Sequence, residues 1–369
     1  MQLQNKIKFG KWEAITLLIN LICTKIFLFY PRMTVEDAGT AGWIMSICSS
    51  VFTFILFFLF MKLYKRFENK DILDIAEHLG GEPLKILTGI IIAGIMLLFE
   101  IIVIREFSED MKIISLPLTP LSFIMFFFSI GAVLGAMLGI EAIVRLSAIV
   151  VPLISAAYII ILLGVIPQTN FNNVFPILGT GLKDIFSNGL FRVSIFAEFM
   201  SIFLLPPFLG DNKKVRSTGY IAIGISSAYL LVSSLIYILT FSYPSSLEPF
   251  NPIYQMARLI NLGRFFQRIE SMFVFIWAMA ALLYITSVFY LAVYVIAKAT
   301  GLKYMRPIIM PLAVIVFSAA FLQPNLISTI EIKTNILYKT LGIGSFAIFA
   351  LIMLLARLRK QTKKGGTAE

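Results

Sequence analysis

The sequence predicts an all-α, polytopic membrane protein, a single membrane domain over residues 1–369 with ten transmembrane helices. Hydrophobic residues make up 59 % of the chain and charged residues only 14 %, against about 25 % charged in ordinary soluble domains. Apolar runs of about 20 residues, the length that crosses a bilayer as a helix, recur along the whole chain. The predicted spans are 12–30, 39–61, 86–104, 121–139, 143–166, 187–209, 218–241, 268–297, 307–323 and 337–356.

The positive charges predict the topology. Of the 31 Lys and Arg residues, 20 lie in segments that would be cytoplasmic if the N-terminus is inside, and 9 lie in the outer segments. By the positive-inside rule, both termini are expected in the cytoplasm. The same distribution accounts for the net charge of +11, so we expect no nucleic acid as a partner.

The first span, 12–30, carries Lys25 well inside its apolar run. A cation at bilayer depth costs about 2.5–3.5 kcal/mol on insertion scales, so it usually pairs with an acid or faces a cavity. A polar stripe recurs every fourth residue of this helix, at Thr16, Asn20 and Thr24. We interpret Pro31 as the end of the span and 32–38 as a short outer loop.

The next segments add a surface helix and a second buried charge. A short amphipathic helix is predicted at 71–79 on the cytoplasmic side, with Asp71 as its cap and Gly80 and Gly81 as its end. The span 86–104 carries Glu100, and the chain is expected to leave the membrane soon after it. Glycines at every fourth position predict a close helix contact, at Gly131, Gly135 and Gly139.

The sixth span, 187–209, resembles the first, because it carries Glu198 inside and ends on two prolines. Ten spans divide into halves of five, at 12–166 and 187–357, and an odd number per half makes the halves inverted repeats. In such folds the first helix of each half is often interrupted where substrate binds. The sequence therefore predicts a fold of the leucine-transporter type. Arg192, close to the start of this span, is expected to extend to the membrane interface.

The second half contains the longest outer loop, in which a helix is predicted at 252–262 along the outer surface. The span 268–297 brings Tyr284 and Ser287 onto one face. The hypothesis for a site joins Lys25 with Glu198, and with Glu100, around a central cavity.

Thr24 and Tyr284 are further ligand-binding candidates. The alternatives are a structural ion pair, a lysine that extends to the interface, and hydroxyls satisfied by neighbouring helices.

Catalysis and cofactor binding are not expected. Cys23 and Cys48 lie inside spans, and His78 is the only histidine. The sequence has no nucleotide-binding loop, no nucleophile and base pair, and no metal-ligand spacing.

Several stretches resemble the membrane B subunit of Ger-type spore germinant receptors, the GerAB family. They are Leu28-Phe29-Tyr30-Pro31-Arg32, Gly42-Trp43-Ile44, Thr119-Pro120, and Arg268-Ile269-Glu270-Ser271 through to Trp277. The resemblance covers nearly the whole chain and implies an amino acid permease-like member of the amino acid-polyamine-organocation superfamily. It also implies a small-molecule germinant, commonly an amino acid, a place in the spore inner membrane or cell membrane, and A and C subunits as partners.

The sequence departs from this family at two positions. Thr24-Lys25-Ile26 stands where members often have a Gly-x-Gly break, and Glu198 stands where they often have a small residue. Because the two departures carry opposite charges in facing helices, we expect them to compensate each other.

Three functions follow as expectations. The first is a receptor subunit that senses a germinant with a transporter fold and triggers spore germination. The second is a secondary transporter for amino acids, and the third is a structural or water- and ion-conducting subunit.

Overall fold

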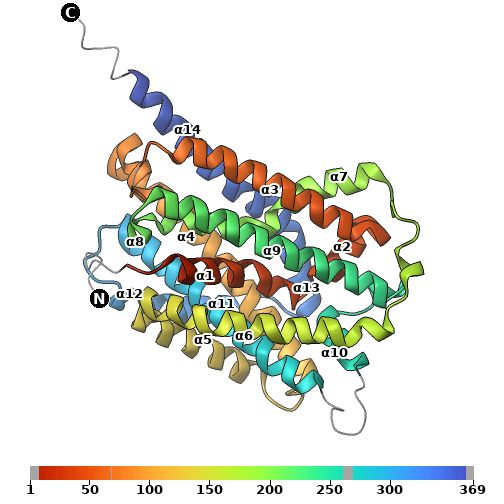
Figure 1. The fold of residues 1–369 in the computed structure, drawn as a ribbon. Coiled ribbons are helices and arrows are strands. Elements are labelled where there is room, and N and C mark those ends of the chain that lie inside the picture. The colour runs from red at the N-terminus through yellow and green to blue at the C-terminus, as the bar shows by residue number, and fades with distance from the viewer. Residues whose placement is uncertain (1–7, 68, 261–268, 363–369) are drawn as a thin grey trace, which may run out of the picture.

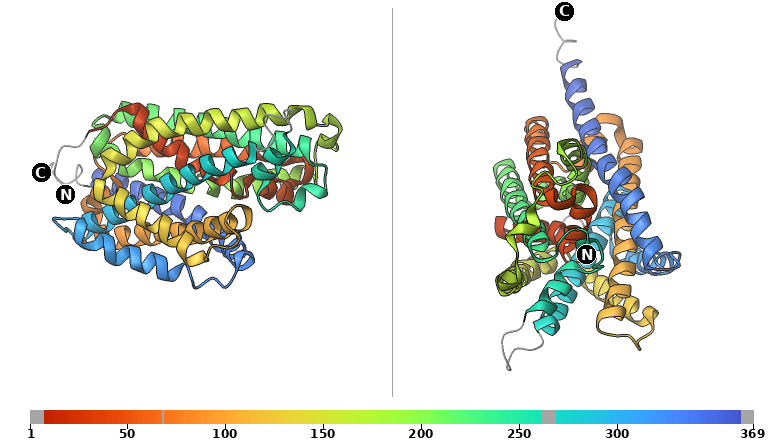
Figure 2. Two further views of the ribbon diagram at one scale, coloured as in Figure 1. Left: turned by 90° about the horizontal axis from the view of Figure 1, so that it is seen from below. Right: turned by 90° about the vertical axis from the view of Figure 1, so that its right-hand side faces the viewer.

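The computed structural model describes residues 8–67, 69–260 and 269–362. Within these residues the chain forms helices and turns with no strand, and the long helices run side by side in one elongated bundle (Figures 1 and 2). The first half contains α1 (Lys11–Cys23), η1 (Thr24–Ile26), α2 (Tyr30–Ala38), η2 (Gly39–Ala41), α3 (Gly42–Tyr64), α4 (Ile72–Ile114), α5 (Leu121–Leu138), α6 (Ile140–Val165), η3 (Ile166–Gln168) and η4 (Phe171–Val174). The second half contains α7 (Leu182–Phe191), η5 (Arg192–Leu204), α8 (Pro206–Leu209), α9 (Asn212–Thr240), η6 (Ser245–Leu247), α10 (Pro252–Leu259), α11 (Ile269–Ala299), α12 (Arg306–Ala319), α13 (Leu326–Ile332), η7 (Lys333–Gly342) and α14 (Ile343–Thr362).

Eight helical stretches of the described chain are long and apolar enough to cross a membrane. The two other predicted spans, 12–30 and 307–323, correspond to the shorter α1 with η1 and to α12. The all-α membrane architecture is therefore confirmed, whereas the count of ten spans stays a prediction.

The first predicted span is broken. Helix α1 ends at Cys23, a short 3-10 turn follows, and α2 begins at Tyr30 after Phe29 has left helical geometry with φ −150° and ψ −10°. The prediction of a loop at 32–38 was wrong, because Pro31 lies in the first turn of α2. Proline suits that position, since its missing N–H would have no partner inside the helix anyway.

The sixth predicted span is irregular as well. It divides into α7, a 3-10 segment η5 of 13 residues and the single turn α8. Runs of 3-10 helix longer than three or four residues are uncommon. Of the three predicted spans with an internal charge, those that carry Lys25 and Glu198 thus change helical geometry beside the charge, whereas Glu100 lies in a regular part of α4.

A third irregular stretch lies near the C-terminus. Between α13 and α14 the chain forms a π-helical segment, η7, and π-helical geometry is rare and frequently found at functional sites. Segment η7 packs against η5, so two irregular segments meet inside the bundle.

Helix α11 is the centre of the packing. It contacts α4, α5, α6 and α1, and 83 % of the residues in its most apolar stretch of 18 residues are buried. Gly131 and Gly135 of α5 face α11, where an added Cβ would overlap Leu282 or Thr286, as expected for close helix packing through small residues. On the other side of α1, α9 packs against both α1 and α3.

Helix α4 begins with a capping box, in which the Asp71 carboxylate accepts hydrogen bonds from the backbone N–H groups of Leu73 and Asp74. Gly81, with φ 72°, introduces a kink between the part predicted at 71–79 and the long membrane part. The predicted outer helix at 252–262 overlaps α10, and residues 261 and 262 lie outside the described residues.

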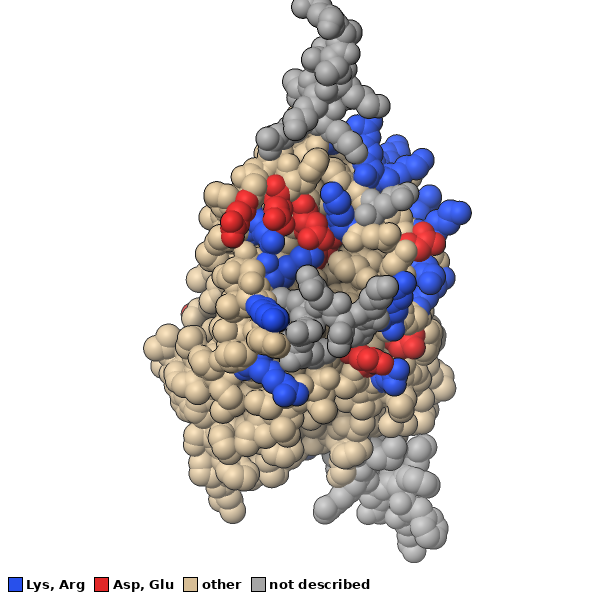
Figure 3. Space-filling view, turned by 90° about the vertical axis from the view of Figure 1, so that its left-hand side faces the viewer, with Lys and Arg blue, Asp and Glu red and all other residues tan. Residues whose placement is uncertain are grey.

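The start of α1 and the end of α14 lie at the same end of the bundle (Figure 1). Figure 3 looks onto that end, where Lys and Arg side chains gather. Helix α2 lies toward the opposite end (Figure 1). We refer to these as the first end and the far end.

Candidate functional site

Lys25 lies at the break of the first segment, on η1, and is only 1 % exposed. Its ammonium forms an ion pair with Glu198 and donates a hydrogen bond to the backbone carbonyl oxygen of Ile195, with Nζ and O 2.5 Å apart. Nζ also lies 5.5 Å from the ring centroid of Tyr338 and 6.0 Å from that of Phe99, within cation–π range. The ammonium therefore has two oxygen acceptors and two aromatic rings around it.

Glu198 connects two further elements. It lies on η5, is 8 % exposed, and uses Oε2 for Lys25, while Oε1 accepts a hydrogen bond from the Tyr284 hydroxyl of α11 at 2.8 Å. The structure thus brings together three of the predicted residues, Lys25, Glu198 and Tyr284. They form a closed network that links η1, η5 and α11.

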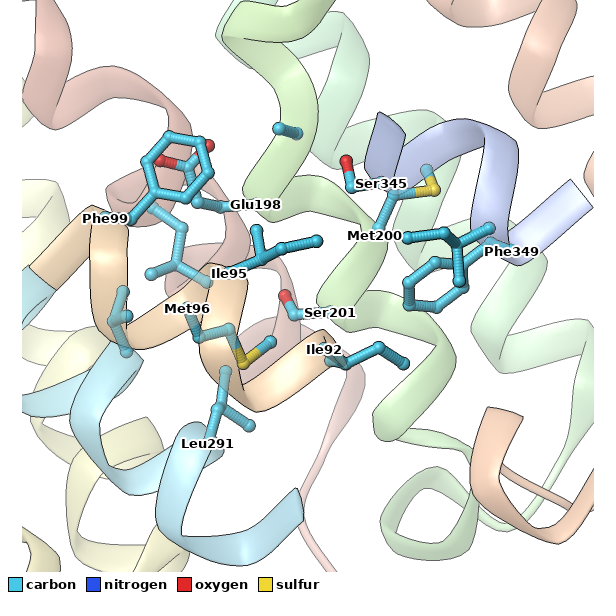
Figure 4. Close-up of a pocket in the computed structure, with 14 residues that line it drawn as sticks. Ile92, Ile95, Met96, Phe99, Glu198, Met200, Ser201, Leu291, Ser345 and Phe349 are labelled. Carbon is cyan, nitrogen blue, oxygen red and sulfur yellow. The ribbon is translucent and has the colours of Figure 1, made fainter. Parts of the chain in front are cut away.

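A mainly apolar pocket of about 40 Å³ borders this network at Glu198 (Figure 4). Its walls come from α1, α4, η5, α11 and α14. The apolar lining labelled in Figure 4 consists of Ile92, Ile95, Met96, Phe99, Met200, Leu291 and Phe349. The polar lining consists of Glu198, Ser201 and Ser345. The buried Ser201 hydroxyl has no hydrogen-bond partner in the part of the chain that the structure describes.

The other two predicted residues lie apart from this network. Thr24 donates a hydrogen bond to the backbone oxygen of Asn20 at 2.7 Å and lines a separate cavity of about 20 Å³ with Tyr158 and Tyr229. Glu100 lies on α4 with 1 % exposure, and its Oε2 has no hydrogen-bond partner among the described residues. Neither residue lines the pocket of Figure 4.

A second buried ion pair joins Lys333 of η7 to Glu106 of α4. This pair was not predicted, because the chain was expected to leave the membrane soon after residue 104, whereas helix α4 continues to Ile114. One signal was present: Glu106 and Asp110 are four residues apart and so share a helix face, and both are almost fully buried. The partner lysine is 227 residues away and carries no comparable signal.

A third pair corrects the interpretation of Arg192 as an interface residue. Arg192 is 6 % exposed and forms a two-pronged ion pair with Asp37 of α2, whose second contact, from an Nη atom to Oδ1, measures 2.8 Å. Asn188 donates to the backbone oxygen of Asp37 at 2.7 Å. The pair thus joins α2, which follows the first break, to the start of η5.

At the first end of the bundle, Asp71 pairs with Lys298 of α11 at 2.6 Å, and Lys298 also contacts Asp74 at 2.8 Å. The Tyr294 hydroxyl donates to Asp71 at 3.1 Å. Burial raises the pKa of Asp71 to about 6, against the lowering effect of Lys298. This group connects the start of α4 to the end of α11.

Opposite charges thus meet at two interrupted segments beside a pocket. An ion pair between such segments stabilises one relative position of the two, and any ligand that splits the pair favours another. Among the described residues, no group of three or more His, Cys, Asp or Glu is placed to hold a metal ion.

Comparison with known proteins gives a family match over nearly the whole chain. The family model described as "Spore germination protein" matches residues 8–359. Spore germination protein YndE of Bacillus subtilis (strain 168) is 23 % identical over 72 % of this chain and 74 % of its own length. Spore germination protein B2 of the same organism is 23 % identical over 56 % of this chain, and the match spans 55 % of that protein's length. Spore germination protein XB of Bacillus anthracis is 20 % identical over 90 % of this chain and 93 % of its own length.

Two solved transporter structures share the fold. Mhp1, a nucleobase-cation-symport-1 family transporter in a closed conformation with bromovinylhydantoin bound, superimposes with a TM-score of 0.66 over 94 % of this chain and 78 % of its own. A Na⁺-coupled sialic acid symporter in a substrate-bound, outward-open state superimposes with a TM-score of 0.64 over 94 % of this chain and 79 % of its own. Both are 11 % identical to this chain. The predicted leucine-transporter-type fold is thereby confirmed.

Proposed function

Because the chain belongs to the spore germination protein family, we propose that it is the integral-membrane subunit of a germinant receptor, which senses a small germinant with a transporter fold and triggers germination. Its place would be the spore inner membrane, with both termini in the cytoplasm. The A and C subunits that the sequence resemblance implies would receive the conformational change.

One observation carries the proposal: the ion pair of Lys25 and Glu198 joins the two interrupted segments and borders a pocket. An α-amino acid is a zwitterion, so it can replace both halves of such a pair at once. Its carboxylate would bind Lys25, its ammonium would bind Glu198, and neither buried charge would be left alone. That condition matters, because an unpaired buried charge costs about 3–5 kcal/mol.

The pocket walls indicate which amino acids suit the site. Beyond Glu198 the lining is aliphatic and aromatic, with only two serine hydroxyls, and the space is about 40 Å³. A small aliphatic side chain would fill it, whereas a charged side chain would lose its hydration without gaining a partner. We therefore propose an apolar amino acid as the germinant, bound with its side chain toward α4 and α14.

A thermal-shift screen of the purified protein against amino acids, sugars and nucleosides tests this. A ligand at 100 times its dissociation constant adds about 2.7 kcal/mol to the free energy of unfolding, so binding is visible as a higher melting temperature. We expect aliphatic amino acids to give the largest shifts and Lys25→Met to abolish them.

Lys298→Met is the matched control, because it removes a lysine from another ion pair and Lys298 does not line the pocket. It should lower the melting temperature without removing the ligand-induced shift. A shift that persists in Lys25→Met, or shifts from sugars and nucleosides alone, would contradict the proposed site.

A secondary transporter for amino acids is the second candidate, favoured by the fold that the chain shares with two symporters. Uptake of a radiolabelled ligand into proteoliposomes separates the two functions. A receptor should bind the ligand at equilibrium without gradient-driven accumulation, whereas a transporter should accumulate it.

A further inference from the structure

A second pocket lies toward the far end of the bundle, between α2, α4, α13 and the segment before α10, and holds about 150 Å³. It shares no lining residue with the pocket at Glu198. Its charged lining residues are Arg32, Glu36, Glu106, Asp110 and Glu331, and its aromatic ones are Phe29 and Phe250. Nothing in the proposed function uses this pocket.

The buried charges here are unbalanced. Glu106 is 2 % exposed and gives only Oε1 to Lys333, while its Oε2 has no hydrogen-bond partner within the described residues. Asp110, 4 % exposed, lines the same cavity one helical turn further along α4. Within the described residues, Lys333 is the buried cation that forms an ion pair with one of these two carboxylates. In the described part of the chain, Glu106 and Asp110 therefore both line the cavity, and the Lys333 ammonium pairs with Glu106 alone.

The other nearby cations have their own partners. Arg32 pairs with Glu36 at 2.8 Å, and Arg105 pairs with Glu109 at 2.7 Å. Each of these is an i,i+4 pair on one helix, so neither guanidinium needs the carboxylates of the cavity. The Glu106 Oε2 atom therefore remains available to a molecule that enters, beside the buried carboxylate of Asp110, which has the Asn251 side chain as a hydrogen-bond partner.

The aromatic walls of the pocket already contact cations. The Lys333 ammonium nitrogen lies 3.5 Å from the Phe29 ring centroid, and the Arg32 guanidinium carbon lies 4.9 Å from that of Phe250. Aromatic faces combined with carboxylates are the groups that recognise organic ammonium ions. The protein's own side chains show that this pocket accommodates positive charge.

We propose that this far-end pocket is a second ligand site, which binds the ammonium group of a small organic amine. Glu106 Oε2 and the Asp110 carboxylate accept its hydrogen bonds, and the aromatic walls cover its carbon substituents. The site is separate from the germinant pocket and does not require the ion pair of Lys25 and Glu198 to open.

Calorimetric titration of the purified full-length protein with methylammonium chloride tests the site, with wild type compared to Asp110→Asn. Asparagine keeps the volume of the side chain and removes a buried charge, so the variant should fold. We expect its dissociation constant to rise about tenfold or more, the loss of one charge-assisted hydrogen bond. Glu331→Gln, at an exposed lining residue of the same pocket, is the control and should leave the constant nearly unchanged.

Two further probes identify the ligand class. Neutral acetamide should give no heat of binding, and potassium chloride at equal ionic strength should compete weakly or not at all. Equal binding of methylammonium to wild type and Asp110→Asn would overturn the proposal. So would potassium binding as tight as methylammonium, which would indicate an inorganic cation site.

A third variant tests the role of the tethered lysine. Lys333→Ala removes the ammonium that Glu106 now holds, so methylammonium should bind more tightly to this variant than to wild type and should raise its melting temperature. If methylammonium raises the melting temperature of Lys333→Ala no more than that of wild type, Glu106 does not form part of the site. Lys25→Met, which affects the germinant pocket, should leave methylammonium binding intact, so the two proposals fail independently.

Discussion

The described part of the chain contains two buried pairs of lysine and glutamate that are alike in construction. Lys25 and Lys333 are each 1 % exposed, each lies on a segment that departs from α-helical geometry, and each is close to an aromatic ring. Their glutamates, Glu198 and Glu106, come from elements 173 and 227 residues away. Both pairs therefore join distant parts of the chain inside the bundle.

The pairs differ in what the glutamate does with its second oxygen. The second oxygen of Glu198 accepts a hydrogen bond from the Tyr284 hydroxyl, whereas Glu106 Oε2 has no partner among the described residues and its side chain borders a cavity. The pair of Lys25 and Glu198, here called the closed pair, stabilises the contact between its segments, and a ligand must split it to bind. The pair of Lys333 and Glu106, here called the open pair, can accept a ligand without any bond being broken. The closed pair therefore suits a switch, and the open pair suits a site that is already formed.

The largest effect is expected from breaking the closed pair. Lys25→Met leaves Glu198 charged and buried, and the free energy of unfolding should fall by about 3–5 kcal/mol. Glu198→Gln should cost a similar amount, and the double variant should recover part of the loss because neither charge is then stranded. Denaturant titration in detergent micelles measures these values. Additive losses would show that the two residues act independently.

Breaking the open pair should cost less. Lys333→Met leaves Glu106 without its ammonium, but the carboxylate borders a cavity of about 150 Å³, which is large enough to admit water. We expect the free energy of unfolding to fall by about 2 kcal/mol, within the range for a buried polar group deprived of its partner. The same denaturant titration checks whether Lys333→Met loses less free energy of unfolding than Lys25→Met. A loss larger than that of Lys25→Met would contradict the distinction between closed and open pairs.

The closed pair was predictable from the sequence, because a charge inside an otherwise apolar span needs a partner. Lys25, Glu100 and Glu198 stand out for that reason, and two of them meet. The membrane architecture and the fold type followed from apolar run lengths and from the likeness between the first and sixth spans. These signals are local in the sequence, so they can be recognised without a structure.

The open pair and α2 were not predictable, for different physical reasons. Lys333 and Glu106 lie among other charges near predicted span ends, where solvation is the ordinary interpretation, and their burial depends on helices that pack over them. Pro31 is ambiguous, because proline ends one helix and also suits the first turn of the next. Arg192 was assigned to the interface because nothing local shows that Asp37 faces it.

A smaller effect should come from opening the closed pair without breaking it. Tyr284→Phe removes the hydroxyl that donates to Glu198 Oε1 and keeps the ring. The free energy of unfolding should fall by about 1.5 kcal/mol, the lower end of the range that a hydrogen bond to a charged group contributes. Tyr290→Phe on the same helix is the control, since its hydroxyl donates to the Met305 sulfur at 4.0 Å rather than to a carboxylate. Equal losses in the two variants would show that the hydroxyl does not support Glu198.

The smallest effect is expected at the third pair, Arg192 with Asp37, which joins the same two interrupted segments from the far side. Arg192→Lys keeps the positive charge and loses the two-pronged geometry, since an ammonium is a point charge where the guanidinium is a fork. A loss of about 1 kcal/mol follows, equal to one ordinary hydrogen bond, again measured by denaturant titration. Because α2 and η5 would then be held less firmly relative to each other, splitting the closed pair should become easier. Amino acid binding at the Glu198 pocket should therefore be no weaker in Arg192→Lys than in wild type, whereas weaker binding would mean that Arg192 positions the pocket itself.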